Sequence, residues 1–172
     1  MFEYPHASVS QICVSDSVRW ELERPLALIF LGKTHSSSAV HQKVIAELER
    51  EGGRSPRIAG LRRTAERSRD ALYVGDFVAL GRAMADNTAL QGELHPDLIS
   101  SDARALIAIA QEHGALGWKV NGAGGEGGSI TLLCGESACA RQSLLRTIAQ
   151  SNQLFQPIPI YLSRFGLRVW EG

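Results

Sequence analysis

The sequence predicts one α+β domain, built from an antiparallel or mixed sheet with helices mainly on one face. Short apolar or alternating segments, typical of strands, are joined either by tight turns or by segments with apolar residues at helical spacing. No internal repeat period is visible. The 172 residues are enough for one domain with its own core and few for two, so we expect residues 1–172 to form a single domain.

Six segments carry strand patterns: residues 7–14, 26–31, 117–121, 129–134, 158–162 and 167–170. Residues 7–14 alternate between apolar and polar side chains, which predicts a strand with one buried face. Residues 26–31 are apolar throughout and have the length of a central strand. Pro157 and Pro159 favour an edge or the start of a strand, because proline cannot donate to a ladder.

Helices are predicted at about residues 40–51, 56–73, 76–90, 101–113 and 137–151, where apolar side chains recur every three or four residues. Pro56 suits a first helical turn. Ser101 or Asp102 is expected to cap the fourth of these helices, and residues 92–97 before it are expected to form a loop.

Composition restricts the partners and the compartment. Eighteen basic and eighteen acidic residues cancel, so no global charge attracts the chain to nucleic acid or anionic lipid. No apolar run approaches the ~20 residues that span a membrane. The first residues lack the pattern of a signal peptide. Three cysteines without metal-ligand spacing are typical of a reducing compartment, so we expect a cytoplasmic protein without a metal site.

The loop from Gly122 to Gly128 is the most informative segment, because five of its seven residues are glycines. Each glycine costs about 0.5–1 kcal/mol relative to alanine in regular structure. Such a loop usually needs positive φ angles, or a bare backbone close to something else, and successive amides can bind an anion. A flexible hairpin turn is the alternative, although turning alone requires fewer glycines.

Two phosphate-binding motifs do not fit. Gly122, Gly124 and Gly127 satisfy GxGxxG, but that motif must open a helix, and here a strand pattern follows. Gly32-Lys33-Thr34 resembles the end of a Walker A loop, yet Ala27 stands where the motif needs its first glycine. Lys33 and the hydroxyl-rich segment after it either bind an anionic ligand group or simply cap the next helix.

Residues 114–125, with the sequence GALGWKVNGAGG, resemble the third signature motif of the GHMP kinases. The preceding segment from Asn87 to Ala110 follows that family's pattern of an asparagine, a leucine, a short loop, a serine cap and a helix. Residues 28–38 are similar to its sugar-kinase members, in particular the heptose 7-phosphate kinases. The resemblance extends over essentially the whole chain and is most specific around residues 113–128.

The resemblance implies the ferredoxin-like antiparallel sheet of a GHMP kinase carboxy-terminal domain. It also implies that the chain is part of an ATP-dependent kinase of a sugar or sugar phosphate, with Mg²⁺. The implied phosphate and substrate loop consists of Gly122, Ala123, Gly124, Gly125, Gly127 and Gly128, and the candidate substrate contacts are Lys33, Thr34, Ser36, Ser37, Ser38 and Lys119. Lys119 is also explained as an ordinary solvated strand residue.

Two departures limit this implication. Glu126 interrupts the glycine run, and a carboxylate would repel triphosphate oxygens, so it points away unless it helps to hold Mg²⁺. The family's amino-terminal domain, with its Pro-x-x-x-Gly-Leu-Gly-Ser-Ser loop and catalytic acidic residue, has no counterpart in these 172 residues. We therefore expect no catalytic residue here, no tight binding of ATP or Mg²⁺ by the chain alone, and no kinase activity without a partner.

The alternative is a non-catalytic binding or interaction module that keeps this fold. A domain without its usual neighbour exposes apolar surface, and such a module would form a homo-oligomer or bind another chain.

Overall fold

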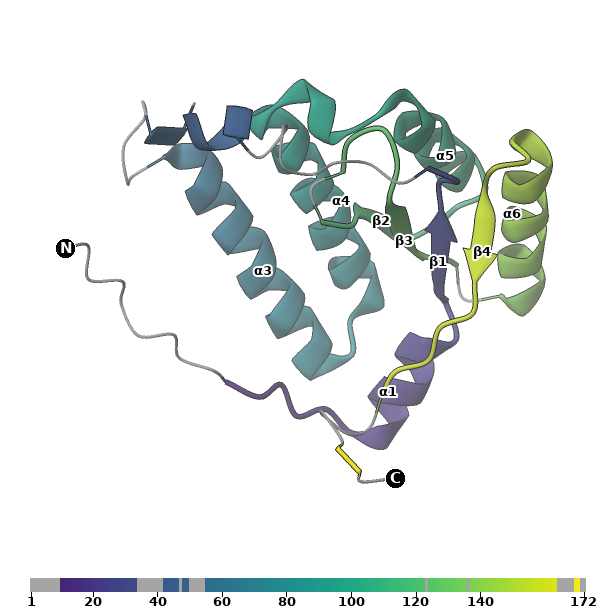
Figure 1. Ribbon diagram of the computed structural model, residues 1–172. Helices are drawn as coiled ribbons and strands as arrows, with labels where there is room; N and C mark the ends of the chain where they lie inside the picture. The colour runs from purple at the N-terminus through teal and green to yellow at the C-terminus, as the bar shows by residue number, and fades with distance from the viewer. Residues whose placement is uncertain are drawn as a thin grey trace.

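A four-stranded sheet organises the part of the chain that the structure describes (Figure 1). This computed structural model describes residues 10–33, 42–46, 48–49, 55–122, 124–135, 137–163 and 169–170. The strands are β1 (Leu26–Phe30), β2 (Gly117–Val120), β3 (Ser129–Leu133) and β4 (Gln156–Ile158). Their order is β2-β3-β1-β4 and every neighbouring pair is antiparallel. Helices separate β1 from β2 and β3 from β4, which gives the predicted ferredoxin-like arrangement.

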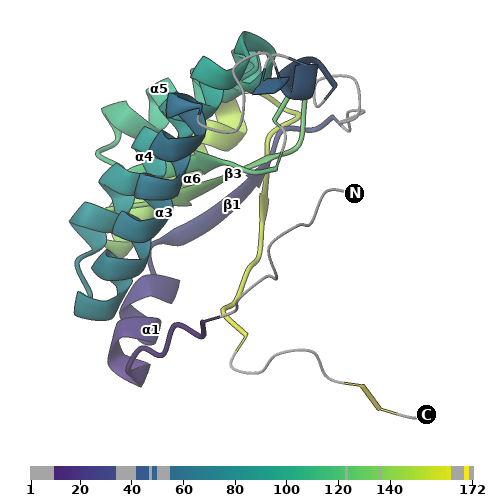
Figure 2. The same cartoon turned by 90° about the vertical axis from the view of Figure 1, so that its left-hand side faces the viewer.

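The helices cover one face of this sheet, as predicted. The described helices are α1 (Asp16–Glu23), α3 (Pro56–Val74), α4 (Phe77–Leu94), the short 3₁₀ helix η1 (Pro96–Leu98), α5 (Ser101–Glu112) and α6 (Ala138–Ser151). Residues 42–46 and 48–49 are helical too. Figure 2 shows α3, α4, α5 and α6 on the same side of the strands.

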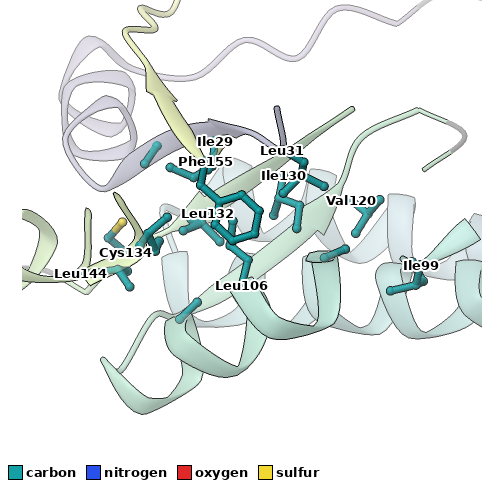
Figure 3. Packing of buried hydrophobic residues seen from close by; sticks show 14 residues of the cluster. Ile29, Leu31, Ile99, Leu106, Val120, Ile130, Leu132, Cys134, Leu144 and Phe155 are labelled. Atoms are coloured by element: carbon teal, nitrogen blue, oxygen red, sulfur yellow. The ribbon is translucent and has the colours of Figure 1, made fainter. Parts of the chain in front are cut away.

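The core lies between the sheet and helices α5 and α6 (Figure 3). Alternate residues of β1 point into it, and Ile29 pairs in register with Ile130 of β3. Leu106 of α5 and Leu144 of α6 close the core from the helical side, and all four side chains are at most 1% exposed. Burial of each such aliphatic side chain contributes about 1.5–3 kcal/mol.

Helix α4 covers the outer edge of β2. Thr88 Oγ1 accepts a hydrogen bond from Val120 N at 3.2 Å and lies 3.2 Å from the carbonyl oxygen of Trp118. Gly81 and Gly117 allow the two backbones to touch, since a Cβ on either would overlap the other segment. An edge strand covered in this way cannot pair with another chain, and the close approach carries the side chains of α4 to the glycine loop.

The predicted central strand, the two hairpin strands and the helices from residue 56 onward are confirmed, with small changes at their ends. Helix α4 continues to Leu94, and residues 92–94 are not a loop, because Gln91 and Leu94 are buried by the packing of this last turn. Helix α5 is capped by Ser100 and not by Ser101 or Asp102: Ser100 Oγ accepts from Ala103 N at 3.1 Å.

The first and last predicted strands are absent at the residues that the structure describes, and the first closing strand is shifted. Residues 10–14 form no strand, and Ile12 is left 41% exposed. The first closing strand is β4, which lies two residues earlier than predicted and occupies an edge, as its proline predicted. Residues 169–170 are not in a strand and Trp170 is 79% exposed. The remaining residues of that last segment, and the end of the helix near residue 51, lie outside the described residues.

Within the described ranges, every helix is too short or too polar to cross a membrane.

Candidate functional site

The glycine loop joins β2 to β3 and has the backbone that its composition predicts. Gly122, Gly124, Gly125 and Gly128 have φ between 61° and 80°, a region that residues with a Cβ rarely adopt. Asn121 holds the base of the loop: its side-chain amide lies 3.0 Å from Ser129 Oγ and its backbone amide donates to the carbonyl of the same serine at 2.9 Å. Ala123 lies outside the described residues.

The bare backbone of this loop packs against other parts of the chain. Gly125 N donates to the carbonyl of Leu98 in η1 at 3.3 Å, and Gly128 N donates to the carbonyl of Lys33 at 3.0 Å. A Cβ on Gly124 would overlap the first of these carbonyl oxygens, and a Cβ on Gly127 would overlap the second. The loop is therefore fixed between the end of β1 and η1, and the amides of Gly124, Gly125, Gly127 and Gly128 already have acceptors within the chain.

A polar cavity of about 290 Å³ lies beside the loop tip. It is lined by Lys33, Pro96, Asp97, Ile99, Ser100, Ser101, Asp102 and Glu126. The loop, the end of β1 and the start of α5 meet here, and this is where the structure places the first predicted contact, Lys33. The exposed Glu126 does not point away from the site but lines the same cavity.

The charges of this cavity are mainly negative, because three carboxylates face one lysine. Lys33 Nζ lies 3.2 Å from Asp102 Oδ2, in an ion pair whose lysine side chain is 51% exposed. Asp97 Oδ2 accepts from Lys43 Nζ at 3.0 Å. This hydrogen bond, with the charges of Lys43 and His95, lowers the pKa of Asp97 below its ordinary value. Among the described residues the cavity thus offers several acceptors to a ligand rich in hydroxyl groups, with Lys33 as the cation of its lining and Lys43 paired to Asp97 beside it.

Lys119 lies apart from this cavity, under α4. Its Nζ donates to Gln91 Oε1 at 2.6 Å and to the backbone carbonyl of Val120. Gln91 Nε2 in turn donates to the carbonyl of Gly122 at 2.9 Å. Burial lowers the pKa of Lys119 to about 8. Lys119 is therefore not the solvated strand residue that the sequence allowed.

A second cavity, of about 300 Å³, surrounds this lysine. The described residues that line it are Val44, Leu61, Asn87, Gln91, Leu94, Leu98, Lys119 and Gly122. The wall is largely apolar, and Lys119 is its one charged member among these residues. Gly122 thus borders this cavity, whereas Glu126 at the other side of the loop borders the polar one.

The predicted site residues are only partly brought together. Lys33 and the loop tip meet at the polar cavity, while Lys119 lies at the apolar one. Thr34, Ser36, Ser37 and Ser38 lie outside the described residues.

The sequence interpretation missed the acidic and hydroxyl side chains at the start of α5 and η1, and it missed Gln91. The pattern Ser-Ser-Asp before a helix was a usable signal for the former. No local signal marks Gln91, which is buried by distant segments.

No described cysteine or acidic cluster forms a further reactive centre. All three cysteines are free, and burial raises the pKa of the Cys134 thiol to about 11. Across the described ranges, no three His, Cys, Asp or Glu side chains are grouped so that they could hold one metal ion.

Comparison with known proteins supplies an independent finding. Residues 68–152 match the family model described as GHMP kinases C terminal. No curated protein sequence matches the chain.

Three solved structures share the fold. L. major mevalonate kinase in complex with R-mevalonate has a TM-score of 0.64 and 22% identity, over 73% of this chain and 37% of that one. The Lin0012 protein from Listeria innocua has a TM-score of 0.69 and 14% identity, over 81% and 39%. A protein designated a sugar kinase, from Campylobacter jejuni, has a TM-score of 0.58 and 15% identity, over 92% and 42%. The chain thus spans about two fifths of the length of these structures.

Proposed function

We propose that this chain, whose residues 68–152 belong to the GHMP kinase family as its carboxy-terminal domain, forms the substrate-binding part of a cytoplasmic sugar or sugar-phosphate kinase. The observation that carries the proposal is the polar cavity beside the glycine loop, where Lys33, Asp97, Asp102 and Glu126 meet two serines at the start of α5. Carboxylates and serine hydroxyls bind sugar hydroxyl groups, and a lysine can pair with a substrate phosphate. One similar structure is designated a sugar kinase, which agrees with this class of acceptor.

The glycine loop has a structural part in this proposal. Its amides donate to Leu98 and Lys33, so the loop fixes the wall of the cavity and presents Glu126 to the substrate. The functional groups of a heptose 7-phosphate match those of the cavity, because it combines many hydroxyl groups with one phosphate that can pair with Lys33.

The described residues do not fit ATP and Mg²⁺ by themselves. A triphosphate needs several cations or free amides, whereas the described lining of this cavity holds three carboxylates and one lysine, and the amides of Gly125, Gly127 and Gly128 beside it already donate within the chain. We therefore assign the nucleotide and its metal to a partner segment with the family's phosphate loop, which the 172 residues do not contain. The chain alone is expected to bind the acceptor and to be inactive as a kinase.

Substrate binding is tested by ¹H–¹⁵N NMR titration of the chain with mannose, mannose 6-phosphate, sedoheptulose 7-phosphate and mevalonate. We expect a saturable shift of the amides of Lys33, Ser101 and Glu126 with a sugar phosphate. Glu126→Gln should weaken binding by at least about tenfold. Glu112→Gln, at the exposed far end of α5, is the matched control and should not. The proposal is overturned if none of the sugars and sugar phosphates shifts these amides.

Inactivity is tested separately by incubating the chain with ATP, Mg²⁺ and the same compounds. Product formation at the background rate is expected. Turnover well above background would show that the chain carries the whole kinase site, while leaving the assignment of the acceptor cavity intact.

A second function, a non-catalytic interaction module, is favoured by one observation. Exposed apolar side chains lie on α1 and on the last turn of α3, which ends beside α1: Trp20 is 59% exposed, Tyr73 48% and Val74 77%. Such side chains are enriched at interfaces between proteins. Sedimentation of the chain would show a stable dimer, weakened by Trp20→Ser, if this surface pairs two copies; a monomer at all concentrations removes this alternative.

A further inference from the structure

The apolar cavity under α4 contains a cation, Lys119, that has no counter-ion among the described residues. Lys119 is the one charged residue among the described residues that line it, and its nearest partners, Gln91 Oε1 and the Val120 carbonyl, are neutral. A lysine ammonium has three N–H donors, and two acceptors are recorded for it in the described part of the chain. Within the described residues the third donor makes no hydrogen bond, so it is the group offered to a ligand that enters the cavity.

The wall of the cavity defines the rest of such a ligand. Val44, Leu61, Leu94 and Leu98 present aliphatic surface from four different segments. Asn87 adds one amide at the rim, already bound through Nδ2 to Thr64 Oγ1 at 2.7 Å. A volume of about 300 Å³ is near the lower limit for ligand pockets. It equals roughly ten water molecules at ~30 Å³ each, enough for a chain of a few carbons with one polar group.

We propose that this cavity binds a small aliphatic monocarboxylate, with the carboxylate on Lys119 and the hydrocarbon against the leucine wall. The site is distinct from the polar cavity beside Glu126 and does not depend on the chain's being part of a kinase. A neutral molecule of the same size would leave the ammonium uncompensated, and a dianion would bring a second charge into an apolar cavity. Since neutral molecules and dianions are both disfavoured, the expected ligand carries a single negative charge.

Gln91 links this site to the glycine loop. Its Oε1 accepts from Lys119 and its Nε2 donates to the Gly122 carbonyl, while the residue itself is only 6% exposed. A carboxylate on the third donor of the ammonium lies beside the Lys119–Gln91 hydrogen bond, so the amide shift of Gly122 reports occupation of the cavity.

The lowered pKa of Lys119 supports this assignment and predicts that ligand affinity depends on pH. Burial without a paired carboxylate brings its pKa to about 8, and a bound carboxylate must raise it again. Affinity should therefore fall as pH rises above about 8, because the free ammonium loses its proton there. From α3, α4, η1 and the helical residues 42–46, no other titratable side chain lines the described part of the cavity.

The test is an NMR titration of the 172-residue chain with hexanoate, and with hexan-1-ol as the uncharged control. We expect hexanoate to shift Gly122 and the Gln91 side-chain amide saturably, at least about tenfold more tightly than hexan-1-ol. Lys119→Met should lose this binding, whereas Arg82→Met, which removes a positive charge from the exposed face of α4, should retain it.

A second variant keeps the proposal testable if Lys119→Met does not fold. Leu61→Phe leaves the ammonium in place and fills the cavity from α3, so it should lose hexanoate binding as well. The proposal is overturned if hexan-1-ol binds as tightly as hexanoate, if either cavity variant binds like the wild type, or if the shifts lie away from Gly122 and Gln91.

Discussion

Replacement of Lys119 by methionine should change the way in which stability depends on pH. Burial lowers the pKa of this lysine from 10.5 to about 8 in the folded chain. Between these two values the unfolded chain binds more protons than the folded one, so the free energy of unfolding rises with pH across this window. The destabilisation by Lys119 is greatest below pH 8, where folding must bury its charged ammonium.

The size of this effect follows from the two pKa values. At about 1.36 kcal/mol for each pH unit between them, the upper bound is about 3.4 kcal/mol. Lys119 is only partly buried and water screens its charge, so we expect about 1 to 2 kcal/mol. Methionine has a similar length and does not titrate. The wild type should therefore gain about 1 kcal/mol relative to Lys119→Met between about pH 7 and about pH 10.

Urea unfolding of the wild type, Lys119→Met and Arg82→Met at the two pH values measures this difference. The arginine variant controls for the loss of one positive charge at an exposed position. Cys134, whose thiol pKa is raised to about 11, titrates in all three proteins and does not contribute to the comparison. If the free energy of unfolding changes with pH by the same amount in Lys119→Met and in the wild type, the ammonium is not desolvated and the reasoning fails.

Three further predictions test the packing of the loop, of the β2 edge and of Cys134. Gly124→Ala should cost at least about 3 kcal/mol in urea unfolding, because its Cβ overlaps the Leu98 carbonyl and its φ is 64°. Gly122→Ala, with a similar φ but open space, should cost about 1–2 kcal/mol, and equal costs would contradict the contact. Thr88→Val should cost about 1–3 kcal/mol and speed amide exchange along β2; unchanged exchange would argue against the edge contact. In the folded chain a thiol reagent should modify two cysteines and spare Cys134; three fast reactions would contradict its burial.

Local patterns predicted most of the elements because those elements depend on local chemistry. The apolar run at residues 26–30 becomes a central strand, and the serine and aspartate caps fix where the helices begin. The alternation at residues 7–14 predicted a strand, but its described residues 10–14 form none, because a strand also needs a partner strand beside it. The sheet is assembled from β1 and from β2, β3 and β4, which come more than a hundred residues later. Alternation alone does not contain this information.

The site was less accessible to prediction than the fold, because its residues are brought together by packing. Lys33 and Glu126 could be singled out from sequence, yet their shared cavity depends on the hydrogen bond from Gly128 N to the Lys33 carbonyl. Gln91 looks like an ordinary polar helix residue. It is buried only because Gly81 and Gly117 let α4 approach the edge of β2.

The glycines of the loop therefore have a different meaning here from that in a phosphate-binding loop. In both, bare backbone and positive φ are required, and the sequence cannot distinguish what the backbone approaches. In this chain it approaches the carbonyls of Leu98 and Lys33, which lie 26 and 91 residues before Gly124. The loop consequently separates two cavities of opposite character, with Gly122 at the apolar one and Glu126 at the polar one. We therefore expect the ligand chemistry around this loop to come from the side chains on its two sides, because the amides of Gly125 and Gly128 are already bonded to these carbonyls.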